Sequence, residues 1–365
     1  MTLTELRPDV VTDHAVTGRS PWQLAWRRIV TDRVALASGL VVLALCALAL
    51  AAPLIAAWNG HDPDEQFRDT GVTDEGLPVA PNGEFWFGTD RLGRDLFVRV
   101  LYAARVSLLV GVVATGMAAL VGVVVGLLAG YYGGVVDTIL PRAMDVVLSF
   151  PYLIFAIAVV SIAGPSLSAT IGVIAFYSWA AIARIVRGQT LTLKEREYVE
   201  AARSMGAGDF RIMFVDILPN LLAPVIVLTT LLVPVAIVFE STLSYLGLGI
   251  TPPTPSWGNL LSEAQGFYRV AWWYLSCPAV ALLLTTLAFN LVGDGVRDAI
   301  DPRMERLFGR RRNARRKARG NAPGDARGDA HGDAPGDAPG DARGDAPGDA
   351  RGSSRRERRR SRLEG

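Results

Sequence analysis

The chain has few of the residues that metal sites and disulfide frameworks are built from. Of its 365 residues, two are cysteines and three are histidines. Cys46 and Cys277 each lie in or beside an apolar run, so neither a disulfide framework nor a thiolate metal site follows from them. His14 and His61 are expected in loops and His331 in the C-terminal tail, so the histidines form no ligand cluster. We therefore expect no metal site.

A phosphate-binding loop is also missing. No Gly-x-x-x-x-Gly-Lys-Ser/Thr pattern occurs in the sequence, and this pattern is the loop that cradles nucleotide phosphates. Gly247 and Gly249 lack the third glycine and the preceding strand of a dinucleotide site. The sequence therefore predicts a protein that is not an enzyme, with no catalytic residues and no cofactor bound by the chain itself.

Long apolar stretches are what the chain has in abundance. Half of its residues are hydrophobic and 20% are charged. Six stretches reach or approach the ~20 residues that cross a bilayer as a helix: 34–58, 106–130, 146–163, 169–186, 221–246 and 274–292. Apolar residues cover all faces of these stretches, whereas the helices of a soluble core carry an apolar stripe. We therefore expect an all-α polytopic membrane protein with six transmembrane helices.

The distribution of basic residues sets the expected orientation. Three regions near span ends are basic: before the first span, after the fourth, and after the sixth. They contain Arg27, Arg28 and Arg33; Arg184, Arg187, Lys194, Arg196, Arg203 and Arg211; and Arg297, Arg303 and Arg306. Six crossings place these regions on one side, and basic residues favour the cytoplasmic side. We expect both termini in the cytoplasm.

Composition divides the chain into five segments. These are a cytoplasmic N-terminal segment (1–33), a first transmembrane helix (34–58), an extracytoplasmic loop and lead-in (59–105), a membrane core (106–302) and a tail (303–365). In the tail a Gly-Asp-Ala-x unit repeats seven times from Gly324 to Arg351. This unit lacks large apolar side chains, so we expect disorder and at most weak affinity for membrane lipid. No aromatic residues accompany the arginines, so no nucleic-acid partner is expected.

One polar segment between two spans has its own pattern. Residues 198–220 read YVEAARSMGAGDFRIMFVDILPN. Gly206 can adopt positive φ and end a first short helix, and Asp209 is a plausible N-cap of a second. Ala201 and Ala202 are small enough to let another surface approach, and Pro219 marks the start of the next span. The segment is either a docking element for a soluble partner or an ordinary amphipathic loop.

This segment resembles the EAA signature of ABC importer permeases, which docks on a nucleotide-hydrolysing subunit. The matching positions are Glu200, Ala201, Ala202, Gly206, Leu218 and Pro219, within a loop spanning 187–220. Other stretches resemble the C-type inner-membrane subunit of dipeptide, oligopeptide and nickel importers. They are 87–107, 130–145, 240–258 and 290–298. The resemblance implies a five-helix type I (MetI-like) importer core preceded by one extra N-terminal helix.

The resemblance also implies function and partners. Such a chain forms half of a path across the bacterial cytoplasmic membrane, beside a second homologous permease. Two ATP-binding cassette subunits consume the ATP, and an extracytoplasmic solute-binding protein delivers the substrate. Peptides are the preferred substrate, with nickel or another small solute as the alternative. A secondary transporter driven by an ion gradient is the competing class, although mid-span charges are scarce and no repeat between halves is visible.

Polar residues inside spans are the candidates for the translocation path. Glu240 lies in the fifth apolar stretch, where an ionisable residue is a functional hypothesis by default. An anchor to an arginine or a backbone donor is the alternative. Ser244 and Asn290 are further path candidates. Gly122, Gly126 and Gly130 recur every fourth residue and are interpreted as a helix-packing stripe.

The Asp/Arg-rich segment 87–95 precedes the second span. Its acidic and basic residues alternate, which is compatible with a solvated face held by ion pairs. Gly88 and Gly93 are interpreted there as turn residues.

Overall fold

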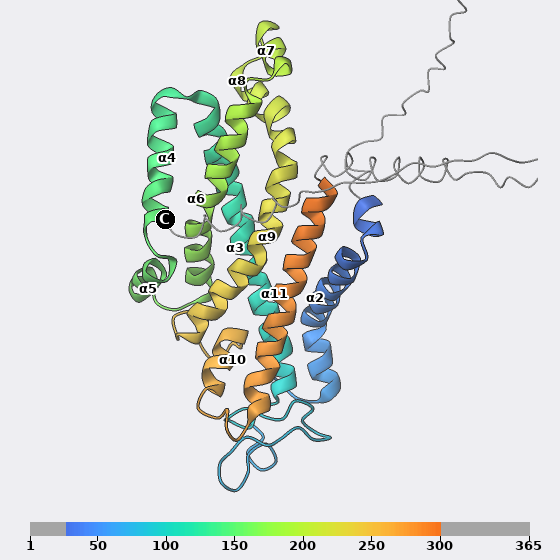
Figure 1. The fold of residues 1–365 in the computed structure, drawn as a ribbon. Coiled ribbons are helices and arrows are strands. Elements are labelled where there is room, and N and C mark those ends of the chain that lie inside the picture. The colour runs from blue at the N-terminus through green and yellow to red at the C-terminus, as the bar shows by residue number, and fades with distance from the viewer. Residues whose placement is uncertain (1–26, 301–365) are drawn as a thin grey trace, which may run out of the picture. The chain divides into compact units, whose positions relative to one another are not determined.

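The structure is a computed structural model that describes residues 27–300 (Figure 1). The predicted repeat tail, its arginine clusters and most of the predicted N-terminal segment lie outside the described residues. Within that range the chain is helical. Its elements are α2 (Arg33–Asn59), α3 (Leu96–Tyr132), α4 (Gly134–Ser149), α5 (Tyr152–Ala163), α6 (Leu167–Leu193), α7 (Glu197–Ser204), α8 (Asp209–Arg211), η1 (Ile212–Ile217), α9 (Leu218–Tyr245), α10 (Trp257–Ala264) and α11 (Trp272–Ile300).

Five helical segments are long and apolar enough to cross a membrane within the described range: α2, α3, α6, the continuous Asp209–Tyr245 segment, and α11. The bent pair formed by α4 and α5 supplies a sixth if it counts as one crossing. α2 differs from the predicted 34–58 by one residue at each end. α3 begins at Leu96, ten residues before the predicted start of the core, because Asp95 caps it by accepting from the amides of Phe97 and Val98.

The third predicted span is wrong as a single helix over 146–163. The structure has two helices there, bent by 88° at the break. Pro151 is the physical reason, since a proline disfavours helical backbone in the residue before it. Phe150 is accordingly extended, with φ −84° and ψ 134°. The pair also begins earlier, at Gly134, than the apolar stretch suggested.

α4 carries two acids, one in its first turn and one near its end, and both pair with arginines of α6. Arg187 Nε lies 2.5 Å from Asp137, and an amino group of Arg184 lies 2.5 Å from Asp145. Both arginines belong to the basic region that was expected after the fourth span. They lie instead within α6, which continues to Leu193.

The glycine stripe of α3 packs against α6 as predicted. A Cβ on Gly122 would lie 2.7 Å from Ile182 Cβ, one on Gly126 would lie 2.5 Å from the Ala183 carbonyl, and one on Gly130 would lie 2.6 Å from Thr190 Cβ. Only glycine lets the two backbones approach this closely. This contact joins two elements on either side of the bent pair.

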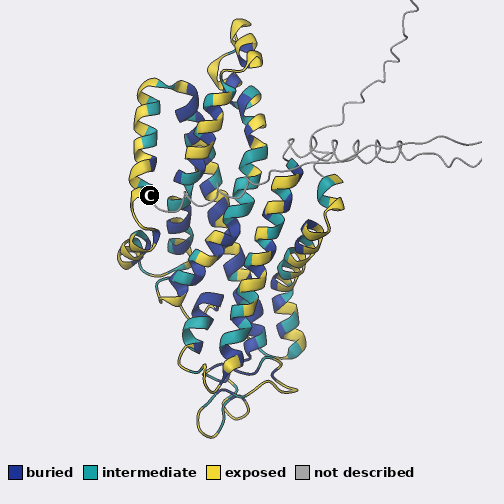
Figure 2. Ribbon diagram, viewed as in Figure 1, coloured by how far each residue is buried: buried dark blue, intermediate teal, exposed yellow. Residues whose placement is uncertain are grey.

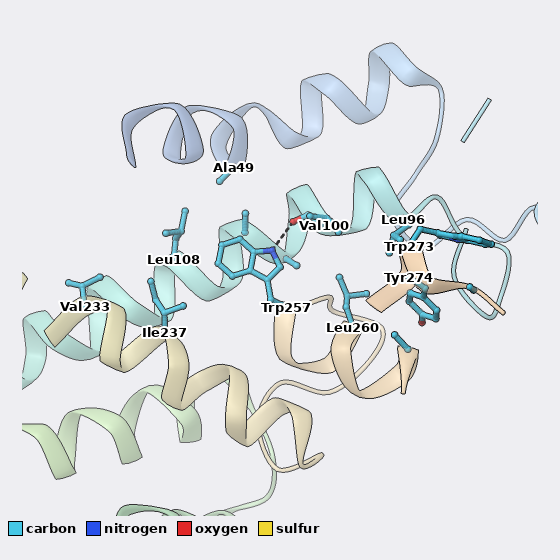
Figure 3. Close-up of a cluster of buried hydrophobic side chains, with 14 residues drawn as sticks. Ala49, Leu96, Val100, Leu108, Val233, Ile237, Trp257, Leu260, Trp273 and Tyr274 are labelled. Carbon is cyan, nitrogen blue, oxygen red and sulfur yellow. Dashed lines mark hydrogen bonds between the residues drawn. The ribbon is translucent and has the colours of Figure 1, made fainter. Parts of the chain in front are cut away.

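The largest buried cluster among the described residues joins α2, α3, α9, α10 and α11 (Figure 3). Trp257 of α10 is fully buried, and its indole N–H donates to the Val100 carbonyl at 3.3 Å. Figure 2 shows buried residues where helices meet and exposed residues on their outer sides. Many of those exposed residues are large and apolar, including Leu43, Leu50 and Leu54 on α2. A surface of this kind suits lipid.

The segment before α3 is folded around buried charges. Arg94 Nε lies 2.6 Å from Asp90, and Arg94 also reaches Glu263 of α10 at 3.2 Å. Arg99 is fully buried and lies 3.3 Å from Asp90. Tyr274 of α11 donates to Glu263 at 2.8 Å. The ion pairs expected in this motif are therefore present, but the expectation of a solvated face is wrong, because α10 and α11 cover them.

Candidate functional site

The segment with the EAA pattern consists of a short helix, α7, and the start of a second helix at Asp209, with Gly206 between them. α7 ends at Ser204, and the amides of Met205, Gly206 and Ala207 bond to the carbonyls of Ala201, Arg203 and Ala202. Gly206 has φ +81°, the left-handed conformation that glycine adopts readily. The predicted break is therefore present at the predicted residue.

Asp209 has a different role from the one expected of it. It is the first residue of α8 rather than its N-cap, which is Gly208. The Tyr131 hydroxyl donates to an Asp209 carboxylate oxygen at 2.7 Å. The carboxylate therefore joins the loop to the end of α3, and Tyr131 is a site residue that the sequence analysis missed. Its place after the glycine stripe was visible, but no sequence signal links it to Asp209.

Pro219 does not begin a separate helix. The chain is continuously helical from Asp209 to Tyr245, with a wider π turn at Ile212–Ile217 just before the proline. Within it the Leu218 amide bonds to the Met213 carbonyl, five residues back. A wider turn is one way in which a helix accommodates a residue without an N–H. The second helix of the loop is thus the first part of the α9 span.

The inner side of the loop is packed against α3 and α6. Val199, Ala202, Ile212, Met213 and Ile217 are buried in one cluster. The same cluster contains Leu127, Tyr131, Ile182 and Val186 from α3 and α6. Lys194, just after α6, also connects this region to α3 by donating a 3.0 Å hydrogen bond to the Gly130 carbonyl. Ala202 therefore serves this internal packing, whereas its neighbour Ala201 is exposed.

The outer side of the loop is open. Glu200, Ala201 and Gly206 are exposed, and Leu218 is partly buried. Two large apolar side chains lie on the same surface, since Met205 is 82% and Phe210 is 73% exposed. Figure 1 shows this loop projecting beyond the ends of the long helices. These two side chains are free to contact another subunit.

Two of the three predicted path candidates, Glu240 and Ser244, lie together and are buried. Glu240 is fully buried between α3 and α9. Its carboxylate accepts from Ser107 and Ser244 at 2.7 Å each and from Ser241 at 3.3 Å. The expected arginine or backbone donor is replaced by these three hydroxyls. Ser244 is also buried and accepts from the Ile250 amide at 3.0 Å. Neither side chain offers a surface to a solute in this conformation.

Asn290 lies elsewhere, on the exposed side of α11. Its amide donates to the Thr286 carbonyl at 2.9 Å. The exposed residues one and two turns before it are Leu287 and Leu283, and the exposed residues after it are Asp294 and Arg297. Asn290 therefore lies where an apolar face gives way to a charged one.

These features define a class of protein. The chain is a multi-pass membrane protein with apolar outer surfaces and a projecting two-helix loop that is continuous with one span. The family described as the binding-protein-dependent transport system inner membrane component matches residues 122–306. The family described as the N-terminal TM domain of oligopeptide transport permease C matches residues 20–72, which include α2. The chain belongs to this family of inner-membrane permease subunits of ABC importers, as the motifs indicated.

Relatives match over most of their length. The chain is 41% identical to the glutathione transport system permease protein GsiD of Pectobacterium atrosepticum over 81% of this chain and 95% of that one. It is 40% identical to the di/tripeptide transport system permease protein DppC of Pseudomonas aeruginosa, over 80% of this chain and 96% of that one. The dipeptide transport system permease protein DppC of Bacillus subtilis is 42% identical, over 78% of this chain and 86% of that one.

A solved structure also shows similarity. It is a chain of the MetNI methionine ABC transporter in inward-facing conformations, with 19% identity and a TM-score of 0.46. The match covers 56% of this chain and 96% of that chain.

Proposed function

We propose that this permease carries peptides, with di- and tripeptides as the first candidates. The relatives at 40 to 42% identity are named for glutathione, di/tripeptide and dipeptide transport. Glutathione is itself a tripeptide, so the three names share one chemical class. The agreement among these relatives is the observation that carries the proposal. Nickel, the alternative raised by the sequence, has no such support.

Competition uptake tests the substrate. A strain lacking this gene, complemented with the chain and its partners, is given labelled dialanine with an excess of unlabelled tripeptide, longer peptide or nickel. We expect peptide to suppress uptake and nickel to leave it unchanged. Uptake of nickel but not of dialanine would overturn the proposal.

The partners follow from the family and from the loop surface. We place a second homologous permease beside this chain, two ATP-binding cassette subunits at the projecting loop, and a solute-binding protein on the opposite side. Both termini would then be cytoplasmic. ATP would bind to the partner subunits alone, so a photoreactive ATP analogue should label them and leave this chain unlabelled.

The loop would act as a lever between ATP hydrolysis and the path. Glu200, Ala201, Gly206 and the exposed Met205 and Phe210 form the partner side. Because Ala202 is buried and α8 runs without interruption through η1 into α9, a displacement of the loop moves the span. Leu218 and Pro219 lie at that junction. Depleting ATP while the ion gradient is maintained should abolish uptake, and continued uptake would favour a secondary transporter.

A further inference from the structure

Three charged residues lie together on the face that α4 and α6 present. Arg142 and Asp145 are three residues apart on α4, a spacing that places them on one side of a helix. Asp145 pairs with Arg184 of α6 at 2.5 Å, and both side chains are more than half exposed, at 57% and 54%. Arg142 is exposed and has no ion pair among the residues that the structure describes. The cluster therefore carries one net positive charge.

The cluster lies within the depth of the spans. Asp145 is eleven residues, about 17 Å along the axis, after the start of α4. Arg184 is nine residues, about 14 Å, before the end of α6. The adjacent helix α3 has no charged residue after Arg105. Arg184 therefore lies inside the end of α6 by about half the thickness of a ~30 Å hydrocarbon core. Asp145, four residues before the end of α4 at Ser149, is paired with it at that depth.

Both sides of the subunit expose large apolar residues, Ile139 and Val146 among them on α4, but α4 and α6 also expose charged residues midway along a span, whereas the middle of α2 and of α11 carries none. Figure 1 shows α2 and α11 side by side, with α4 at the opposite side of the helical array. Exposed residues of α2 and α11 include Leu43, Leu50, Leu283 and Leu287, a surface suited to lipid. Charged side chains inside a membrane face protein or water rather than lipid. The α4–α6 face is therefore the side turned away from lipid.

The geometry points to a role in transport: we propose that the α4–α6 face lines the translocation path, and that Arg142, beside the Asp145–Arg184 pair, binds the carboxylate of a solute in transit. Arg184 is followed on α6 by exposed Ile185 and then by exposed Gly188, Gln189 and Thr192, so the surface toward the loop is small or polar beyond one isoleucine. A free guanidinium presents a fork of donors that matches a carboxylate. Naming that carboxylate as a peptide C-terminus rests on the proposed function, whereas the path-lining position does not.

Cysteine accessibility tests the position of the face in the assembled transporter. In a background of Cys46→Ala and Cys277→Ala, cysteine is introduced at Arg142 or Gln189 and, as matched controls, at Leu43 or Leu283. A charged, water-soluble methanethiosulfonate reagent should modify the first two at least tenfold faster than the controls. Equal rates would overturn the proposal. If the cysteine at position 142 reacts in the isolated chain but not in the assembled transporter, the face is a contact between permeases. That result would also overturn the proposal.

Reagent charge tests the anion site without any substrate. At Gln189→Cys, the ratio of modification rates for an anionic and a cationic methanethiosulfonate is measured with and without Arg142→Gln. We expect the substitution to lower that ratio roughly threefold to tenfold, because it removes the unpaired positive charge. Arg68→Gln, in the loop before α3, should leave the ratio unchanged. An unchanged ratio in Arg142→Gln overturns the anion site.

Dialanine then connects the site to transport. In the wild-type transporter saturating dialanine with ATP should slow modification at Gln189→Cys, and Arg142→Gln should reduce dialanine uptake severalfold at equal expression. If the wild type does not transport dialanine, the proposed substrate fails while the accessibility result stands. If the wild type transports it and Arg142→Gln does so equally well, the carboxylate site fails.

Discussion

The Tyr131 hydroxyl donates a 2.7 Å hydrogen bond to the carboxylate of Asp209. The two residues are 78 positions apart and belong to the end of α3 and the first turn of α8. Because α8 continues through η1 into α9, this bond connects one span directly to the base of another. It makes the projecting loop part of the membrane core rather than an appendage to it.

Removing that hydroxyl should weaken coupling. A hydrogen bond to a charged group contributes about 1.5–3 kcal/mol, so Tyr131→Phe should loosen the loop without unfolding the chain. We expect several times less peptide transported per ATP hydrolysed, with normal assembly of the complex. Tyr132→Phe is the matched control, since Tyr132 is exposed. If both variants transport the same amount of peptide per ATP hydrolysed, the hydrogen bond has no role in coupling ATP hydrolysis to transport.

The helix break at Gly206 gives a second prediction. With φ +81°, a side chain there is strained by about 1 kcal/mol or more, and proline cannot adopt the conformation at all. Gly206→Ala should partly uncouple ATP hydrolysis from uptake, and Gly206→Pro should do so completely, with the complex still assembled. Replacement of the exposed Glu200 should also uncouple ATP hydrolysis from uptake.

Gly208→Ala provides the control for the helix break, because Gly208 has φ −73°. It should transport normally. Wild-type uptake in Gly206→Pro would contradict the lever mechanism. The measurement is ATPase activity and uptake in the same proteoliposomes.

The α3–α6 contact predicts a stability effect. A Cβ at Gly126 would lie 2.5 Å from the backbone carbonyl of Ala183, which cannot move independently of its helix. Gly126→Ala should therefore lower the free energy of unfolding by about 1–3 kcal/mol, as overpacking does. Thermal unfolding in detergent measures it. Gly116→Ala, with no atom within 4 Å of the added Cβ, should not be destabilised in this way, and an equal loss in both variants would refute the packing argument.

Glu240 is predicted to hold α9 to α3 rather than to line the path. Glu240→Leu would leave the buried hydroxyls of Ser107 and Ser244 without their acceptor, at about 1–3 kcal/mol for each group. Glu240→Gln keeps an acceptor and the side-chain volume, so it should lower the unfolding temperature less. A path role would instead show as lost uptake in both variants at unchanged thermal stability.

The tail gives a prediction that depends on sequence and family alone. The matched permease family ends at residue 306, before the Gly-Asp-Ala repeat. Deletion of residues 320–365 should leave uptake at the wild-type rate, measured at equal membrane expression. Abolished uptake would indicate a functional tail.

Sequence patterns predicted the local features of this fold well. The first helix, the glycine stripe and the break at Gly206 depend on residues close together in the chain, and each lies where it was expected. The third span could not be predicted as it is, because its first half carries Asp137 and Asp145. Their arginine partners on α6 are 50 and 39 positions away. A hydropathy average over neighbouring residues therefore registers the two acidic charges but not the ion pairs that neutralise them.

By itself, the sequence determined that the chain is a helical membrane protein of the ABC importer permease family, since apolar length and local motifs are properties of contiguous residues. Only the tertiary structure decided what the charged and polar side chains do. Glu240 is enclosed by hydroxyls, one of them from a residue 133 positions away, whereas Arg142 and Arg184 are exposed. Whether a charge inside a membrane is buried, paired or open to a solute depends on which helices lie beside it, and that is fixed by packing between distant segments.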